Sequence, residues 1–276
     1  MPPDVLVVGE ALVDVMVAPD GTRTERPGGS PANVAVGLAR LGHHVTLLTA
    51  LGDDEHGRLI RRHLDSSGVE VIASPIARTS TATATIDREG KASYVFEIDW
   101  KLDDLPEPRD AWLHIGSLGS VLPPGADAVL ELARAAARLS FDPNCRPSFT
   151  DLTRVDELIR LSHTVKLSDE DVASLRPDQP AGEVAAGWLR SGPELVVLTK
   201  GADGATAFTR EGVVEAPAAD GAAVVDTVGA GDAFMAGLLD GLLRSLPLPE
   251  VLARAATTAR RTCERVGADP PWAREL

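Results

Sequence analysis

The chain has 276 residues and a formal net charge of −14, and 44% of its residues are hydrophobic while 25% are charged. These proportions are typical of a globular protein with one large core. No apolar run approaches the roughly 20 residues of a membrane span. The acidic balance argues against nucleic acid and anionic membranes as partners, because a basic patch would oppose the field of the whole molecule.

The N-terminus and the cysteines favour a cytoplasmic location. The first four residues contain no basic side chain of the kind that opens a signal peptide. Cys145 and Cys263 are too few for a disulfide framework and lack metal-ligand spacing. We therefore expect a cytoplasmic protein with two reduced thiols.

The chain opens with two predicted strands. Residues 4–9 form an apolar run typical of a strand buried on both faces, and residues 12–17 resume a strand pattern around Asp14. An isolated Asp in an apolar strand is costly unless paired, so Asp14 either meets a ligand or caps a turn. The spaced glycines of a dinucleotide-binding turn are missing after Gly9, which argues against an NAD-dependent dehydrogenase.

A helix with an unusual start follows. Ser30 is expected to be its N-cap and Pro31 its first helical residue. An ordinary capped helix explains these two residues but not the double glycine, Gly28 and Gly29, which brings bare backbone to the helix start. Asn33, one turn into the helix, can offer a donor and an acceptor to a polyhydroxy ligand.

The rest of the chain predicts an α/β fold. Strands are expected at residues 45–51, 69–72, 112–115, 139–141, 164–167 and 195–199, with helices between them and two closing helices at 233–243 and 252–266. This succession indicates a three-layer α/β/α sandwich with a mostly parallel sheet. An edge hairpin is expected at residues 205–216.

Residues 81–98 alternate between apolar and polar side chains and predict an antiparallel hairpin, which interrupts this succession as an insertion. With the strand around Asp14 it is expected to form a small sheet over the site, the lid sheet (residues 12–27 and 77–100). The α/β core would then comprise residues 1–11, 28–76 and 101–276. Tyr94 and Phe96 share one face of the lid sheet, which could pair with a second lid across a two-fold axis to give a homodimer.

Polar residues follow several predicted strands, at residues 114–117, 142–146, 168–171 and 200–204. Ligands of open α/β sheets bind beyond the carboxyl ends of strands, so these clusters are expected to face one crevice. Residues 226–232 form a small-residue loop that leads into an apolar helix, where Gly229, Ala230 and Gly231 leave their amides open to an anion. Asp232 is either the N-cap of that helix or a base beside the anion.

The stretches 28–33 and 226–232 resemble, in this order and separation, the two signatures of the ribokinase-type (pfkB) carbohydrate kinases. Residues 9–14, 142–147 and 199–204 also fall where the family has counterparts. Within the family the chain is most similar to bacterial fructokinases and 2-keto-3-deoxygluconate kinases. The resemblance implies a ribokinase-like fold and transfer of the γ-phosphate of Mg·ATP to a primary sugar hydroxyl, fructose or 2-keto-3-deoxygluconate being the expected acceptor.

The resemblance also implies roles for the matched residues. Asp232 would be the catalytic base, with the amides of Gly229, Ala230 and Gly231 as an anion hole for the phosphoryl group. The expected sugar-binding residues are Asp14, Gly28, Gly29, Asn33, Asn144 and Arg146, and the expected ATP-binding residues are Lys166, Ser168, Thr199, Gly201 and Gly204. Asp171 would position Mg²⁺ through water, and the carbonyls of Asp226 and Thr227 would hold a monovalent cation such as K⁺.

One departure from the family pattern leaves alternatives open. The family's phosphate and Mg²⁺ motif is Asn-x-x-Glu, whereas Ser168 and Asp171 stand at the corresponding positions here. Loss of metal placement would make the chain a sugar-binding sensor without catalysis, although Asp232 argues against this. Nucleosides and other sugars also remain possible acceptors.

Overall fold

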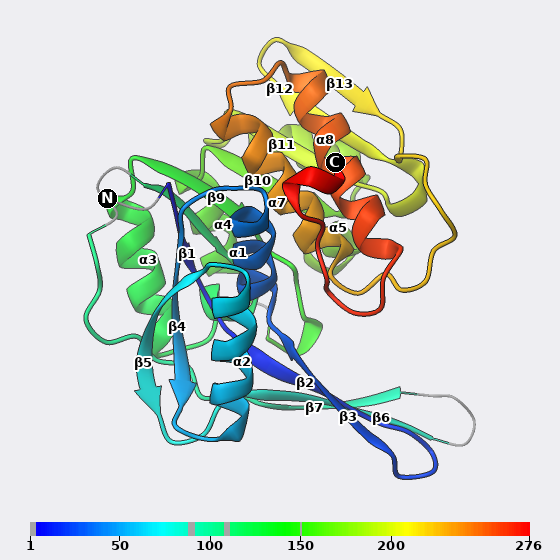
Figure 1. The fold of residues 1–276 in the computed structure, drawn as a ribbon. Helices are drawn as coiled ribbons and strands as arrows, with labels where there is room; N and C mark the ends of the chain where they lie inside the picture. Colours follow the sequence, from blue (N-terminus) through cyan, green and yellow to red (C-terminus); the bar gives the residue numbers. More distant parts are fainter. Residues whose placement is uncertain (1–3, 88–91, 108–110, 150) are drawn as a thin grey trace.

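The computed structural model describes residues 4–87, 92–107, 111–149 and 151–276, and its centre is a nine-stranded sheet of order β13-β12-β11-β10-β9-β8-β1-β4-β5 (Figure 1). The parallel strands are β1 (Val5–Val8), β4 (Val45–Gly52), β5 (Glu70–Ile76), β8 (Trp112–Gly116), β9 (Arg138–Asp142), β10 (Thr164–Ser168) and β11 (Leu195–Thr199). The expected edge hairpin, β12 (Ala205–Thr209) and β13 (Gly212–Ala216), adds antiparallel strands at one edge.

Helices cover both faces of this sheet, which confirms the expected three-layer α/β/α sandwich. One layer contains α1 (Ser30–Arg40), α2 (Glu55–Ser66), α7 (Ala230–Leu243) and α8 (Leu248–Cys263). The other contains α3 (Gly125–Ala135), α4 (Leu152–Leu161), α5 (Asp169–Leu175) and α6 (Ala181–Leu189). In β1, Val5 and Val7 face the first layer while Leu6 and Val8 face the second, which is why this strand is apolar throughout.

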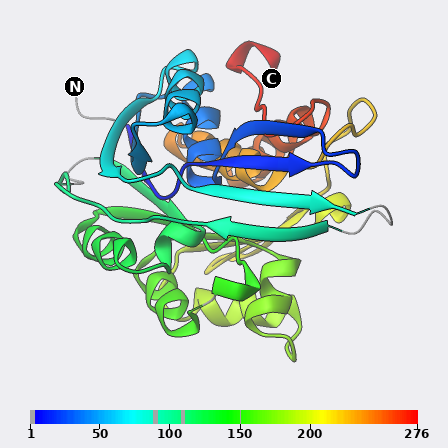
Figure 2. The same ribbon diagram turned by 90° about the horizontal axis from the view of Figure 1, so that it is seen from below.

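The lid sheet has the strand order β3-β2-β6-β7 and projects from the core (Figures 1 and 2). Its strands are β2 (Leu12–Val17), β3 (Arg23–Gly28), β6 (Thr81–Ile86) and β7 (Ala92–Glu97). The hairpin β6–β7 beside β2 agrees with the expectation. Strand β3 was not predicted, because its sequence RTERPG is largely exposed and has no apolar alternation. The division of the chain into core and lid stays a prediction.

Several helices begin earlier than expected, and α8, for example, begins at Leu248 and not at residue 252. In α1 the N-cap is Gly29, with φ 100° and ψ 121°, so the expected N-cap role of Ser30 is wrong and Ser30 is the first helical residue. In α7 the N-cap is Gly229 in the left-handed region (φ 76°), and the helix begins at Ala230. A Cβ at Gly229 would lie 2.8 Å from Ala268 Cα, so both the conformation and the close packing require glycine there. Among the described helices, none has the combination of length and apolarity that crossing a bilayer requires.

Candidate active site

The first turns of α1 and α7 meet at Asp232. This carboxylate is only 8% exposed, and its Oδ1 accepts a hydrogen bond from Ser30 Oγ at 2.7 Å while its Oδ2 accepts one from Asn33 Nδ2 at 2.8 Å. Both donors are neutral, so they orient the carboxylate without forming an ion pair with it. Sequence reasoning missed this role of Ser30 because its hydroxyl looked like a helix cap.

The double glycine lets β2 and the β1–β2 connection approach the start of α1. A Cβ at Gly28 would lie 2.8 Å from Asp14 Cγ, and one at Gly29 would lie 2.5 Å from the carbonyl oxygen of Glu10. The structure therefore brings Asp14 next to Gly28 and within electrostatic reach of Asp232. Although Asp14 keeps solvent exposure, partial desolvation by the surrounding protein and then the charge of Asp232 raise its pKa to about 6.

Glu10 is a buried acid to which the sequence analysis gave no role, although it lies in the stretch 9–14 that has a counterpart in the family. Its Oε2 accepts a hydrogen bond from Gly119 N at 2.8 Å, and Trp100 Nε1 donates to Gly119 O at 2.9 Å. Burial raises the pKa of Glu10 to about 7, although hydrogen bonds from Gly119 and Ser117 and the charge of Arg146 oppose the shift. The signal available in the sequence was an acidic residue directly after the glycine that ends an apolar strand.

A buried ion pair joins the last residue of β9 to the middle of β10. Lys166 Nζ lies 2.9 Å from Asp142 Oδ2, and the two residues are 4% and 0% exposed. Burial works to lower the pKa of Lys166, but the charges of Asp142, Asp171 and Asp232 outweigh burial and raise that pKa. Lys166 therefore stays an ammonium ion. Burial and the positive charge of Lys166 lower the pKa of His114 to about 3, which keeps that imidazole neutral.

The loop after β9 carries Asn144 and Arg146. Asn144 has a positive φ of 38°, and its Oδ1 accepts a hydrogen bond from Arg146 Nη1 at 2.9 Å. The exposed guanidinium also donates to the carbonyl oxygen of Cys145 at 3.2 Å. Arg146 acts electrostatically on Glu10 and Asp14, so the loop faces the same region as these acids.

Ser168 and Asp171 form a capping box that begins α5. Asp171 Oδ2 accepts hydrogen bonds from Ser168 N at 2.8 Å and Ser168 Oγ at 2.7 Å, and its Oδ1 accepts one from Cys145 N at 2.7 Å. The carboxylate thus links α5 to the loop of Asn144. In the parts of the chain that the structure describes, no group of three or more His, Cys, Asp or Glu could hold a metal ion.

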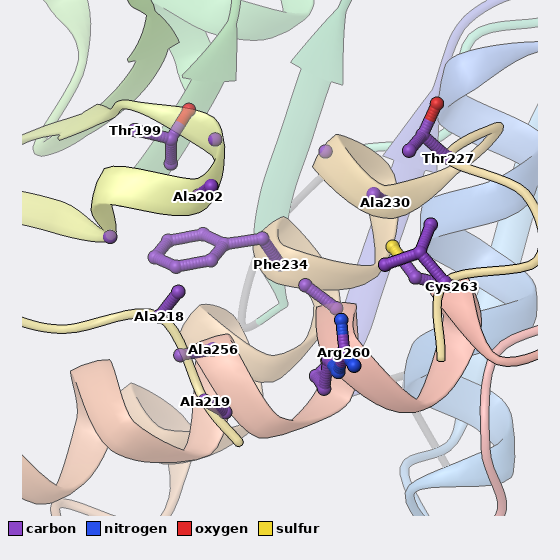
Figure 3. A pocket seen from close by; sticks show the side chains of 15 residues that line it. Thr199, Ala202, Ala218, Ala219, Thr227, Ala230, Phe234, Ala256, Arg260 and Cys263 are labelled. Carbon is purple, nitrogen blue, oxygen red and sulfur yellow. The ribbon is translucent and has the colours of Figure 1, made fainter. Parts of the chain in front are cut away.

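A cavity of about 370 Å³, the apolar pocket, adjoins the start of α7 (Figure 3). It is lined by Thr199, Gly201, Ala202, Gly204, Ala218, Ala219, Val224, Thr227, Ala230, Gly231, Phe234, Ala256, Ala259, Arg260 and Cys263. The ring of Phe234 points between Ala202 and Ala218. Volume and lining suit the flat base of a nucleotide. The pocket brings the expected ATP-binding residues Thr199, Gly201 and Gly204 to the 226–232 loop, while Lys166 and Ser168 do not line it.

The 226–232 loop is fixed by its own hydrogen bonds. The carboxylate of Asp226 accepts hydrogen bonds from Val228 N at 3.0 Å and Gly267 N at 2.8 Å, which lower the pKa of Asp226. The carbonyl of Thr227 accepts one from Ala230 N at 3.1 Å. The amide of Ala230, expected in the anion hole, is therefore already used in this turn.

Comparison with known proteins identifies the family of the chain. The model of the pfkB family carbohydrate kinases matches residues 2–274. A fructokinase of Salmonella typhimurium is 34% identical over 280 residues, covering 94% of this chain and 91% of that protein.

Solved structures of fructokinases share the fold. The fructokinase from Xylella fastidiosa with bound ATP superposes with a TM-score of 0.84 at 27% identity, covering 96% of this chain and 93% of that one. A double mutant of the fructokinase from Vibrio cholerae O395, in a form with fructose, ADP and potassium bound, gives 0.82 at 26% identity, covering 96% and 93%. Because the family model spans almost the whole chain and the Salmonella typhimurium relative shares a third of its residues, the chain belongs to the pfkB family of carbohydrate kinases.

Proposed function

We propose that the chain transfers the γ-phosphoryl group of ATP to a primary hydroxyl of fructose, with Asp232 as the base. The observation that carries the proposal is the position of Asp232. Its carboxylate is oriented by Ser30 and Asn33, and it follows directly on Ala230 and Gly231, which line the apolar pocket. A base and an anion-binding helix start therefore adjoin a cavity that suits a nucleotide base.

The reaction is an in-line displacement. The sugar oxygen forms a bond to the γ-phosphorus while the bond from that phosphorus to the β–γ bridging oxygen breaks, and ADP leaves with the electron pair. Asp232 takes the proton of the attacking hydroxyl. The amides and dipole at the start of α7 stabilise the negative charge on the phosphoryl oxygens. Gly229 and Gly231 keep side chains away from this point.

A neutral ketose suits the site better than a sugar acid. Asp14 and Asp232 would face the proposed sugar position, and after desolvation the charge of Asp232 is the second cause of the raised pKa of Asp14. Carboxylates accept hydrogen bonds from sugar hydroxyls but repel the carboxylate of 2-keto-3-deoxygluconate. Gly28, Gly29, Asn33 and Asn144 would supply further polar contacts. Arg146 already donates hydrogen bonds to Asn144 and Cys145 of its own loop, which makes it a weaker partner for the carboxylate of an acidic sugar.

We propose Mg²⁺ as the cofactor of ATP, where it would neutralise phosphate charge. Both oxygens of Asp171 already accept hydrogen bonds, so this residue would reach the ion only through water, and the nucleotide phosphates would supply most ligands. The proposed ATP-binding residues are Lys166, Ser168, Thr199, Gly201 and Gly204. A K⁺ ion at the carbonyls of Asp226 and Thr227 stays a prediction, as does the cytoplasmic location.

We also propose a homodimer formed through the lid sheet. Met16 and Tyr94 are 52% and 64% exposed, and both pair in register with Ala84, so they lie on one face of the sheet. The ring of Tyr94 stacks on Phe96 with centroids 6.4 Å apart. An exposed apolar face of this kind suits a second copy of itself across a two-fold axis.

The acceptor is tested by measuring ADP release with Mg·ATP against fructose, 2-keto-3-deoxygluconate, ribose, other hexoses and nucleosides. We expect fructose to give the highest kcat/KM. A higher kcat/KM for 2-keto-3-deoxygluconate would contradict the charge argument, and a nucleoside as best acceptor would replace the proposed substrate class.

A further inference from the structure

The buried pair of Asp142 and Lys166 has more hydrogen-bonding capacity than the protein uses. Among the described residues, the hydrogen bond that Lys166 Nζ makes is the one to Asp142 Oδ2 at 2.9 Å, although an ammonium has three donors. Asp142 Oδ1 is buried and has no hydrogen-bond partner in the described part of the chain. Buried polar groups left unsatisfied in this way need an explanation, and a ligand is one.

The free donors of Lys166 lie against the first turn of α7. A Cβ at Gly231 would lie 3.2 Å from Lys166 Nζ. Gly231 precedes Asp232 and lines the apolar pocket, so the ammonium lies near the helix turn at which the proposed base adjoins that pocket. Because Gly231 has no side chain, residue 231 places no Cβ against the ammonium of the buried Lys166.

The electrostatics of the region require a cation at this point. The carboxylates of Asp142, Asp171 and Asp232 all act on Lys166 and keep it charged despite its burial. A phosphoryl group entering among these acids would be repelled unless a positive charge faced it. Arg146, another basic residue of the region, is exposed and donates hydrogen bonds to Asn144 and Cys145 of its own loop.

We infer that Lys166 is a catalytic residue that donates hydrogen bonds to the non-bridging oxygens of the phosphoryl group in transfer, and that Asp142 is the positioning residue that holds its ammonium in place. The inference rests on the proposed kinase function and deepens it. Lys166 stays protonated throughout, so the proton of the sugar hydroxyl still goes to Asp232. Asp142 acts only through Lys166.

The inference predicts that a double variant recovers thermal stability but not activity. Removing one member of a buried ion pair leaves an unpaired buried charge, whereas removing both members relieves that charge. Lys166→Gln and Asp142→Asn should each lower the Tm, and the double variant Lys166→Gln/Asp142→Asn should recover most of it. The kcat of the double variant should nevertheless remain about 100-fold below that of the wild type, with the KM for the sugar changed less than about three-fold.

A binding measurement tests the same contact without turnover. Calorimetry with ADP and with an ATP analogue that has a non-hydrolysable β–γ bridge should show that the double variant binds ADP almost normally but binds the analogue about ten-fold more weakly. The matched control is Asp240→Asn/Arg254→Gln, which removes the ion pair between the buried Asp240 of α7 and the partly buried Arg254 of α8. That control should change the Tm without changing the ratio of the two affinities.

The outcomes separate the inference from the proposed function. If the wild type is an active kinase, Asp232→Asn is inactive, and the folded double variant keeps kcat within about three-fold, then the inference alone is wrong. An unchanged ratio of analogue to ADP affinity would also overturn it. If the wild type phosphorylates no acceptor, or Asp232→Asn stays active, the proposed function fails, and the affinity ratio still tests whether Lys166 contacts a terminal phosphate.

Discussion

Asn33 Nδ2 donates a hydrogen bond to Asp232 Oδ2 at 2.8 Å, joining two residues that lie 199 positions apart in the chain. The bond ties the first turn of α1 to the first turn of α7. The two stretches that carry the family resemblance therefore build one feature, an oriented carboxylate at the helix start that we propose binds the phosphoryl group. The following predictions test parts of this arrangement.

Replacing Asn33 by Leu should lower kcat by about 10- to 100-fold, because a misoriented base accepts the hydroxyl proton less well. Ser30→Ala, which removes the hydrogen bond to the other carboxylate oxygen, should have a similar but smaller effect. Steady-state kinetics with saturating ATP and sugar measure both effects. Unchanged kcat in both variants would show that these hydrogen bonds do not orient a base.

Gly28→Ala should raise the KM for the sugar, because the added methyl would displace the Asp14 carboxylate whose Cγ lies 2.8 Å from that position. The KM for ATP should not change. Gly182→Ala is the matched control, since a Cβ there meets only Phe208 Cζ, at 3.9 Å. Equal sugar KM values in wild type and Gly28→Ala would mean that Asp14 does not contact the sugar.

Glu10 should make the protein less stable as the pH rises. Its pKa is raised from 4.5 to about 7 on folding, so between these values the folded state binds more protons than the unfolded state, and stability falls as pH increases. Glu10→Gln should remove this loss, which is on the order of 3 kcal/mol across the window.

Urea unfolding of wild type and Glu10→Gln at pH 5 and pH 8 measures the effect, with the exposed Glu131→Gln as control. If the stability of Glu10→Gln falls between pH 5 and pH 8 by as much as that of the wild type, Glu10 is not the group responsible.

Tyr94→Ser should shift the protein from dimer to monomer if the lid sheets pair, because it removes an aromatic ring that is 64% exposed on the proposed interface. Light scattering over a concentration series measures the mass. Val213→Ser, at an exposed position on the far edge strand β13, is the control. A monomeric wild type at working concentration would remove the proposal.

The parallel core was predictable because its strands are buried on both faces and read as short apolar runs, as Val5 to Val8 do. Strand β3 escaped prediction because its pairing with β2 depends on backbone hydrogen bonds and not on an apolar face. The early start of α7 depends on packing between Gly229 and Ala268, which no local pattern encodes.

Some residues of the candidate site were likewise predictable from the sequence, and others were not. Asp232 and the glycines of both loops are marked by local sequence, since bare backbone beside a carboxylate is unusual. The pairing of Lys166 with Asp142 depends on the alignment of β9 and β10, and the contact of Ser30 with Asp232 depends on how α1 packs on α7. Such contacts follow from tertiary structure and could not be derived from spacing alone.

The most direct test of the account is the turnover of Asp232→Asn. The substitution conserves shape, and the Ser30 hydroxyl can accept a hydrogen bond from the new amide, so the fold and the affinities for ATP and fructose should persist. The account predicts a fall in kcat of about 100- to 10,000-fold with dissociation constants changed less than about three-fold. A folded Asp232→Asn variant with kcat near that of the wild type would contradict it.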